Sequence, residues 1–279
     1  MKTIAIANQK GGTGKTTTTY NLGVALAQQG YRVLMVDFDP QGNLSAYCGV
    51  PPQDDLSNTI GNLMQITTSG RVPIYNDFVT HIELQGGKMP QVDLIASNLG
   101  LANFAVTMQT LMCRETILKS CLSWYADQYD YCLIDCAPSL GLLLVNALTA
   151  ANEVIVPMQA QPFSVLGVAQ LSEAISEVRS KINPKLRIGG ILMTMTEHNS
   201  VSEGISLKVR STYGSKFRIF RTEIPKNVDI QKSSAVGQAA LEYDPKCSGA
   251  KAYTEFAKEV LNDGREKKLS RCAENALDR

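Results

Sequence analysis

Short apolar runs, each followed by a polar or turn-forming residue, recur along most of the chain. Runs of about 4–8 apolar residues bounded by turn residues are typical of strands buried on both faces of a parallel sheet. We therefore predict strands at 3–7, 31–37, 92–96, 131–135, 153–157 and 186–193, and a short strand at 217–220.

Apolar residues at helical spacing separate these runs. The clearest sets are Leu22, Ala25 and Leu26, and then Val168, Leu171, Ile175 and Val178. The spacing predicts helices at 18–29, 99–125, 165–182, 201–213 and 250–261. From 44 to 91 the pattern is weak and interrupted by glycines and prolines, so we expect helices and loops there without firm boundaries.

Strands that alternate with helices indicate an α/β fold, in which a doubly wound and mostly parallel sheet carries helices on both faces. No repeat, low-complexity segment or linker divides the chain. We therefore predict a single domain at 1–264, followed by a charged C-terminal tail at 265–279.

Composition narrows the function classes. The chain is 44% hydrophobic and 19% charged, with a net charge of +1, so contact with nucleic acid would require a local basic patch. Its seven cysteines include no C-x-x-C pair, which favours a reduced, cytoplasmic compartment. The chain enters a predicted strand within three residues, and no apolar run approaches the length of a membrane span, so we expect neither a signal peptide nor a membrane association.

The most informative segment is 8–17, N-Q-K-G-G-T-G-K-T-T, between the first predicted strand and the first predicted helix. This context is the one in which a glycine-rich loop binds phosphate, because the loop N–H groups and the helix dipole converge on one anion. In such a loop Lys15 reaches the β- and γ-phosphates, and the Thr16 hydroxyl ligates Mg²⁺.

The loop departs from the general pattern in an informative way. The pattern G-x-x-x-x-G-K-[ST] requires a glycine at position 9, where this chain has Gln9, and a second lysine, Lys10, heads the loop. This K-G-G-x-G-K-T version is the deviant Walker A motif. The residues we expect to bind ATP are Lys10, Gly11, Gly12, Thr13, Gly14, Lys15, Thr16 and Thr17.

Acidic residues end two of the predicted strands. Asp37 and Asp39 follow the second strand, and Asp135 ends the fourth. The carboxyl ends of parallel strands are where open α/β sheets bind ligands. We expect Asp135, as the Walker B acid, and Asp37 to hold Mg²⁺ with Thr16, while one carboxylate positions the attacking water.

These motifs resemble the ParA/Soj partition ATPases of the MinD/ParA superfamily. The resemblance includes the deviant Walker A loop and the segments 36–43, 131–141, 224–228 and 243–250, and it runs from residue 1 to about residue 261. It implies an ATPase whose ATP-bound homodimer buries two nucleotides between its subunits. Lys10 would act across the interface, Asp39 would position the water, and Met195, Pro225 and Asn227 would line the adenine.

The resemblance also implies partners. The ATP-bound dimer would bind DNA without sequence preference, in association with the nucleoid, until a ParB-like centromere-binding protein stimulates hydrolysis. The chain lacks two arginines usual in this family, since 194–199 contains none and Asp229 stands at the second position. The basic residues that could replace them are Lys208, Arg210, Lys216, Arg218, Arg221, Lys226 and Lys232.

Three other functions share this loop. A MinD-like membrane switch would need a strong amphipathic anchor, whereas the 265–279 tail mixes acids with bases and has no aromatic residue. A redox ATPase like the nitrogenase iron protein would need two cluster-binding cysteines, and neither Cys132 nor Cys136 lies in a matching sequence. A metabolic ligase or synthase would carry a substrate motif, and the sequence offers none that we can identify.

Overall fold

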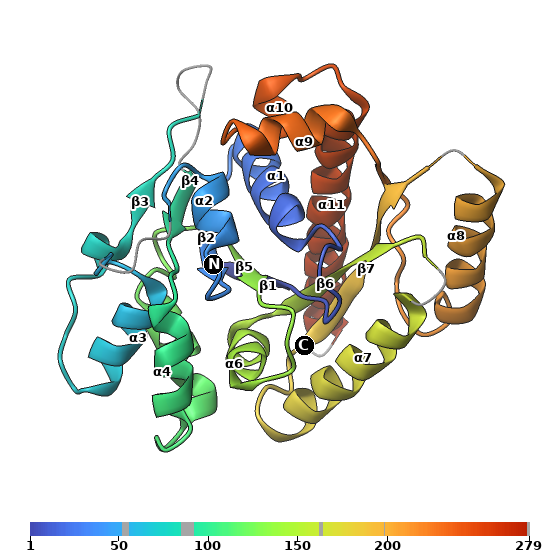
Figure 1. Ribbon diagram of the computed structural model, residues 1–279. Coiled ribbons are helices and arrows are strands. Elements are labelled where there is room, and N and C mark those ends of the chain that lie inside the picture. Colours follow the sequence, from blue (N-terminus) through green and yellow to red (C-terminus); the bar gives the residue numbers. More distant parts are fainter. Residues whose placement is uncertain (52–55, 85–91, 162–163, 198, 278–279) are drawn as a thin grey trace.

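One eight-stranded sheet forms the centre of the computed structural model, which describes residues 1–51, 56–84, 92–161, 164–197 and 199–277 (Figure 1). The strand order is β3-β4-β2-β5-β1-β6-β7-β8, and only the β3–β4 pair is antiparallel. The strands are β1 (Lys2–Ile6), β2 (Val33–Phe38), β3 (Thr80–His81), β4 (Val92–Ile95), β5 (Tyr131–Cys136), β6 (Glu153–Gln159), β7 (Arg187–Thr196) and β8 (Ile224–Pro225).

Helices cover both faces of this sheet, as the sequence predicts (Figure 1). Side chains of β1 alternate between the faces: Ile4 and Ile6 pack with the first set of helices, and Ala5 packs with the second. The first set is α1 (Lys15–Gln28), α2 (Asn43–Tyr47), α9 (Val228–Ala235), α10 (Ala240–Tyr243) and α11 (Ser248–Leu277). The second is α3 (Ile60–Thr68), α4 (Gly100–Met108), α5 (Ile117–Ser123), α6 (Leu142–Ala150) and α7 (Ser164–Lys181), with α8 (Ser200–Tyr213) beyond β7.

Two predicted elements are wrong. The helical region expected at 99–125 is not continuous: it consists of two helices, α4 and α5, with a break between them that contains Cys113, whose backbone is left-handed (φ 54°). The strand expected at 217–220 is a single bridge between Ile191 and Ile219, and the edge strand is β8 instead. The helix predicted at 250–261 forms only the first part of α11.

Helix α6 was not predicted, although it directly follows the turn after β5. Its residues are apolar around most of the helix, because it packs on the sheet and also between α5 and α7. A helix that is apolar around most of its surface lacks the separate apolar and polar faces by which a surface helix is recognised in a sequence. The structure thus places a buried helix immediately after Asp135 and the turn that follows it.

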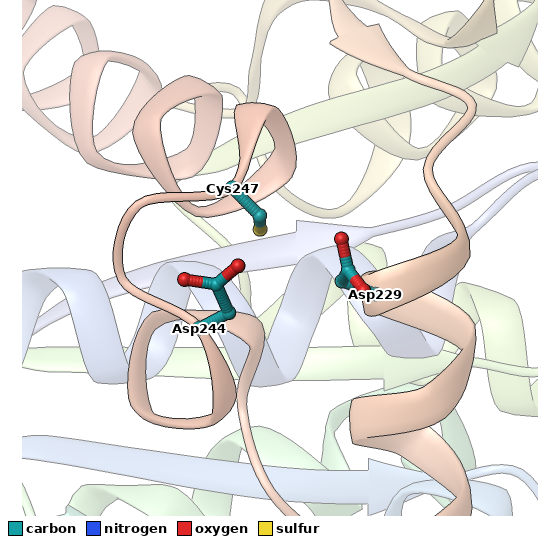
Figure 2. A group of neighbouring side chains, drawn as sticks. All are labelled: Asp229, Asp244 and Cys247. Carbon is teal, nitrogen blue, oxygen red and sulfur yellow. The ribbon is translucent and has the colours of Figure 1, made fainter.

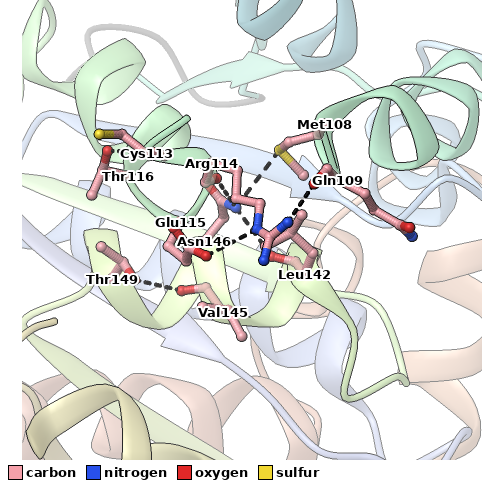
Figure 3. Close-up of polar contacts among 10 residues, drawn as sticks. All are labelled: Met108, Gln109, Cys113, Arg114, Glu115, Thr116, Leu142, Val145, Asn146 and Thr149. Atoms are coloured by element: carbon pink, nitrogen blue, oxygen red, sulfur yellow. Dashed lines mark hydrogen bonds and ion pairs between the residues drawn. The ribbon is translucent and has the colours of Figure 1, made fainter. Parts of the chain in front are cut away.

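A fully buried amide on α6 fixes the turn between α4 and α5 (Figure 3). Asn146 donates hydrogen bonds from Nδ2 to the carbonyl oxygens of Arg114 (2.8 Å) and Leu142 (3.1 Å). Its Oδ1 accepts a hydrogen bond from the backbone N–H of Leu118 at 3.1 Å. The Arg114 guanidinium in turn donates to the carbonyl oxygen of Gln109. One side chain of α6 therefore binds both the turn before α5 and the first turn of α5.

We expect Asn146→Ala to lower the free energy of unfolding by about 2–3 kcal/mol, because it leaves a buried N–H and a buried carbonyl without partners. Urea denaturation measures the change. Asn103→Ala, on the exposed side of α4, is the matched control and is expected to change stability by less than about 0.5 kcal/mol. Equal effects of the two substitutions would contradict the role given to Asn146.

Candidate nucleotide-binding site

The loop between β1 and α1 lies at the carboxyl edge of the sheet, beside the ends of β5 and β6. Gly12 (φ 71°) and Gly14 (φ 85°) both adopt the left-handed conformation, and Gly14 is the N-cap of α1. Residues with a Cβ rarely take this conformation, so the glycines allow the loop to curl into the start of the helix. The N-terminus of α1 therefore faces the concave side of the loop, as an anion site requires.

Three side-chain hydrogen bonds join the loop to strands β6 and β7 and hold it in place. Asn8 Nδ2 donates to the Pro157 carbonyl (2.6 Å), Gln159 Nε2 donates to the Gly12 carbonyl, and Thr194 Oγ1 donates to the Thr13 carbonyl (2.9 Å). None of these three side chains is a predicted site residue. Gln159 and Thr194 stand at the carboxyl ends of β6 and β7, and that position was the signal that could have identified them.

The two loop lysines have different surroundings. Lys15 is buried, and its Nζ donates to the Lys10 carbonyl at 3.4 Å. Burial lowers the pKa of Lys15, although the charges of Asp135, Cys136 and Asp39 oppose this shift. Lys10 is half-buried, and its Nζ donates to Gln161 Oε1 at 2.6 Å. The structure therefore brings both lysines into one loop, with only Lys15 close to the acids.

Asp37 and Asp135 are paired in register on the adjacent strands β2 and β5, and both are almost fully buried. Asp135 accepts hydrogen bonds from the hydroxyls of Thr16 (2.7 Å) and Thr19 (3.4 Å). Asp37 accepts from the backbone N–H and the hydroxyl of Ser45, at 2.8 and 2.7 Å. The three predicted metal-binding residues, Thr16, Asp37 and Asp135, thus lie at one edge of the sheet.

The burial and mutual repulsion of Asp37 and Asp135 favour a cation bound between them. Burial raises the pKa of Asp135 to about 8, and the charge of Asp37 adds to the shift. Burial also raises the pKa of Asp37 to about 6, although hydrogen bonds from Ser45 and Asp39 act against it. Two carboxylates that repel each other in a buried site gain most from a positive charge between them. Carboxylate and hydroxyl oxygens are ligands that Mg²⁺ prefers.

Asp39 completes the acidic edge. It is 8% exposed, its Oδ1 accepts a hydrogen bond from the Gln41 N–H at 3.0 Å, and its own N–H donates to Asp37 Oδ1. The short turn after β2 thus places a third carboxylate at the same edge of the sheet. Asp39 is close enough to Lys15 for its charge to raise the lysine pKa.

A cavity of about 170 Å³ adjoins the loop. The three residues expected at the adenine, Met195, Pro225 and Asn227, all line it. Met195 lines it in a left-handed conformation (φ 52°), which is unusual for a side chain of this size. The other lining residues include Gly14 and Thr17 from the loop, Pro225 and Asn227, and two residues that sequence reasoning missed, Ile230 and Tyr253. A mainly apolar pocket beside a phosphate loop suits a nucleotide base.

Asn227 already uses both ends of its amide. Oδ1 accepts from the N–H groups of Asp229 (2.6 Å) and Ile230 (3.2 Å) and so caps α9, while Nδ2 donates to Ser248 Oγ at 2.8 Å. Asn227 therefore shapes the cavity by joining α9 to the start of α11, and one Nδ2 hydrogen is left for a ligand.

Asp229, Asp244 and Cys247 form a second group of potential metal ligands, with ligand atoms within 4.8 Å of one another (Figure 2). Each group already has a local partner. Asp229 pairs with Lys232, Asp244 accepts from the Lys246 N–H, and the Cys247 sulfur accepts from the Ala250 N–H. These contacts account for Asp229 as an ion-pair partner within α9, and for Asp244 and Cys247 as acceptors from backbone N–H groups between α10 and α11.

Most of the candidate basic residues are ion-paired. Arg210 pairs with Glu223 (2.8 Å), Arg218 with Glu259 (3.3 Å), Lys226 with Glu197 (2.7 Å) and Lys232 with Asp229 (3.7 Å). Lys208, Lys216 and Arg221 are exposed, and no ion pair involving them is found among the described residues. The charge available to a polyanion in this region is therefore smaller than the sequence suggests.

Comparison with known proteins gives consistent results. The family model of the AAA domain matches residues 1–188. The chromosome partitioning protein ParA of Caulobacter vibrioides is 38% identical over 270 residues, which cover 96% of each chain. The sporulation initiation inhibitor protein Soj of Bacillus subtilis is 35% identical, covering 94% of this chain and 99% of that protein. This chain is a ParA/Soj family ATPase.

Two further matches place this ParA/Soj chain within its wider group. Cobyrinic acid a,c-diamide synthase of Mycobacterium smegmatis, solved with ADP and magnesium, is 33% identical with a TM-score of 0.80, covering 95% of this chain and 96% of that one. The model of the 4Fe-4S iron sulfur cluster binding proteins, NifH/frxC family, matches residues 118–278, so the chain also belongs to that broader family. Within this range, the cysteines whose side chains the structure describes are all buried: Cys121, Cys132, Cys136 and Cys247.

Proposed function

We propose that this protein is an ATP-driven DNA-segregation ATPase, which pairs as a homodimer around ATP, binds DNA without sequence preference in that state and releases it after hydrolysis. The juxtaposition of Lys10 and Lys15 in one loop beside Asp37, Asp39 and Asp135 supports this proposal most strongly. The ParA and Soj relatives, named for chromosome partitioning and sporulation control, support the choice of cargo.

The described geometry suggests a role for each group at the nucleotide. Lys15 and the N-terminus of α1 would hold the β- and γ-phosphates, and the base would enter the cavity beside Met195 and Pro225. Thr16, Asp135 and Asp37 would hold Mg²⁺, which supplies charge neutralisation at the phosphates. Asp39 would orient the attacking water from the turn after β2.

Lys10 is the residue whose proposed role requires a second subunit. Its ammonium is directed to Gln161 rather than to the acids around Lys15. In the proposed dimer it would reach the phosphates of the partner subunit and neutralise the charge that develops on the γ-phosphoryl group, as an arginine finger does. Hydrolysis would then require dimerisation, and a ParB-like partner would accelerate it.

The binding of DNA would depend on Lys208, Lys216 and Arg221, the exposed basic residues of the 208–232 region without an ion pair in the described structure. Because phosphate contacts release counterions, we expect binding that weakens steeply with salt. Two subunits would double the number of contacts, which is a physical reason why the ATP-bound dimer would bind DNA and the monomer would not.

Gel-shift assays with ATP, with ADP and without nucleotide test this function directly. We expect a shift only with ATP, and a loss of at least tenfold in affinity, with a shallower salt dependence, when Lys208, Lys216 and Arg221 are all changed to alanine. Alanine at Lys119, Arg179 and Lys185, which are exposed, removes the same charge elsewhere and is expected to leave binding intact. DNA binding that is absent with ATP, or indifferent to nucleotide, would refute the segregation function.

The MinD-like alternative predicts a lipid target instead. No helix in the described residues is long and apolar enough to cross a membrane. Sedimentation with vesicles of anionic lipid, in the presence of ATP, distinguishes the two functions: we expect the protein to remain in the supernatant. Co-sedimentation that depends on ATP, without a DNA shift, would favour the membrane switch.

A further inference from the structure

The end of β6 touches the phosphate loop at two successive points. Gln159 holds the Gly12 carbonyl, and two residues later Gln161 holds the Lys10 ammonium at 2.6 Å. The chain bends tightly between them, since the Gln161 N–H donates to the Gln159 carbonyl at 2.8 Å. This bend fixes the backbone of Gln161 relative to the loop that it contacts.

The backbone of Lys10 is held as well. Its N–H donates to Asn8 Oδ1 at 3.0 Å, and its carbonyl accepts from Thr13 Oγ1 and Lys15 Nζ, both at 3.4 Å. The side chain is therefore the part of Lys10 that is free to move, and among the described residues its ammonium donates to Gln161. An ammonium that is to cross a subunit interface must first leave that partner.

We propose that Gln161 is a positioning residue that holds Lys10 over its own subunit and thereby sets how readily two ATP-loaded subunits pair. This inference rests on the proposed role of Lys10 across the interface. The amide of Gln161 and the phosphates of the partner subunit compete for one ammonium. The Lys10–Gln161 bond consequently stabilises the monomer and not the dimer.

The two-fold symmetry of the dimer doubles the free-energy change that results from losing the Lys10–Gln161 bond. In a two-fold dimer both subunits give up the same bond, so the change in the dimerisation constant is the square of the change per subunit. A hydrogen bond of this kind at a solvent-accessible site is worth a factor of about five, so its loss in both subunits is expected to tighten pairing about 25-fold. A carboxylate at this position would hold the ammonium more strongly and weaken pairing.

The bond itself is tested in the nucleotide-free protein, independently of dimerisation. Acetic anhydride modifies exposed amines, and peptide mass spectrometry gives the rate at each lysine. We expect Gln161→Ala to raise the modification rate of Lys10 about threefold to fivefold, relative to Lys216 in the same sample. An unchanged rate would show that Gln161 does not hold Lys10 and would overturn the inference.

The consequence for pairing is measured by analytical ultracentrifugation with a non-hydrolysable ATP analogue. We expect Gln161→Ala to tighten the dimer about 25-fold and Gln161→Glu to weaken it, a pair of opposite effects that mere loss of structure would not produce. Gln65→Ala and Gln65→Glu, at an exposed position on α3, make the same changes of size and charge and are expected to have no effect. Shifts in the same direction for both Gln161 variants, or no shift, would overturn the inference.

The outcomes separate this inference from the proposed function. If Lys10 is required for turnover but the Gln161 variants pair as the wild type does, the holding role of Gln161 is wrong and the function stands. If Gln161→Ala tightens pairing as expected but no variant binds DNA with ATP, the holding role stands and the segregation function is wrong.

Discussion

Lys10→Ala is expected to reduce ATP turnover by about 10³-fold or more while leaving measurable ATP binding. A cationic side chain supplied across an interface to a transferring phosphoryl group contributes about 10³–10⁵ to the rate. Binding survives because Lys15, Thr16 and the N-terminus of α1 remain in place. Phosphate release gives the turnover, and a fluorescent ATP analogue gives the affinity.

Mixing variants shows whether Lys10 acts on its own subunit or on the partner. We expect Lys10→Ala and Asp39→Ala each to be inactive alone and to recover about a quarter of wild-type turnover when mixed equally, since half of the dimers would be mixed and each would have one complete site. Lys119→Ala, on the exposed surface of α5, serves as the control for loss of a lysine. Full turnover by Lys10→Ala alone would remove the proposed mechanism.

Asp135→Asn is expected to lower Mg²⁺-dependent ATP turnover and to raise the stability of the nucleotide-free protein. Loss of one of the buried carboxylates that would hold Mg²⁺ should reduce Mg²⁺-dependent turnover by at least about 100-fold. Without nucleotide and Mg²⁺, the same substitution should raise the free energy of unfolding at pH 7.5 by about 1–2 kcal/mol, because it removes a carboxylate whose charge the folded protein disfavours.

The pH dependence follows from the direction of the pKa shift. The pKa of Asp135 is higher in the folded protein, at about 8, than in the unfolded chain, so the folded protein binds the extra proton between these values. Its stabilising effect is present in full below the unfolded pKa of about 4 and is lost as the pH rises through 8. Urea denaturation from pH 5 to 8.5 should show a steeper loss of stability in wild type than in Asp135→Asn.

Asp93 provides the matched control for this experiment. It is a buried acid on β4 that accepts hydrogen bonds from His81 at 2.6 Å and from Tyr129. Because hydrogen-bond donors hold its carboxylate, we expect Asp93→Asn to lower stability and leave Mg²⁺-dependent turnover unchanged. If Asp135→Asn proves less stable than wild type at pH 7.5, the account of the acid pair is wrong.

Much of the fold could be predicted because buried parallel strands produce apolar runs that end at turn residues. The runs at 31–37 and 131–135 gave both the strands and the acids at their ends, which the structure pairs in register. The features that could not be predicted depend on the backbone conformation of single residues or on tertiary packing. The break between α4 and α5 contains one left-handed residue, Cys113, and α6 has no polar face because helices and sheet enclose it.

The candidate site could be proposed from the sequence where its residues lie in contiguous motifs. Lys10, Lys15 and the acids could be recognised because their spacing is fixed by the loop and the strand ends. Gln159 and Thr194 lie at strand ends, but their contacts with the loop, like that of Gln161, arise only from the packing of the chain around it. The ion pairs of Arg210 and Lys226 are likewise invisible in the sequence, and they change which charges are available.

The two edges of the sheet limit how copies of this protein can assemble. In the described chain the edge strands β3 and β8 have only two residues each, and Pro225 in β8 has no N–H to offer. Addition of a neighbouring strand, the route by which exposed sheets grow into fibres or exchange segments, needs a long unpaired edge. Filament growth of this protein by strand addition is thus disfavoured.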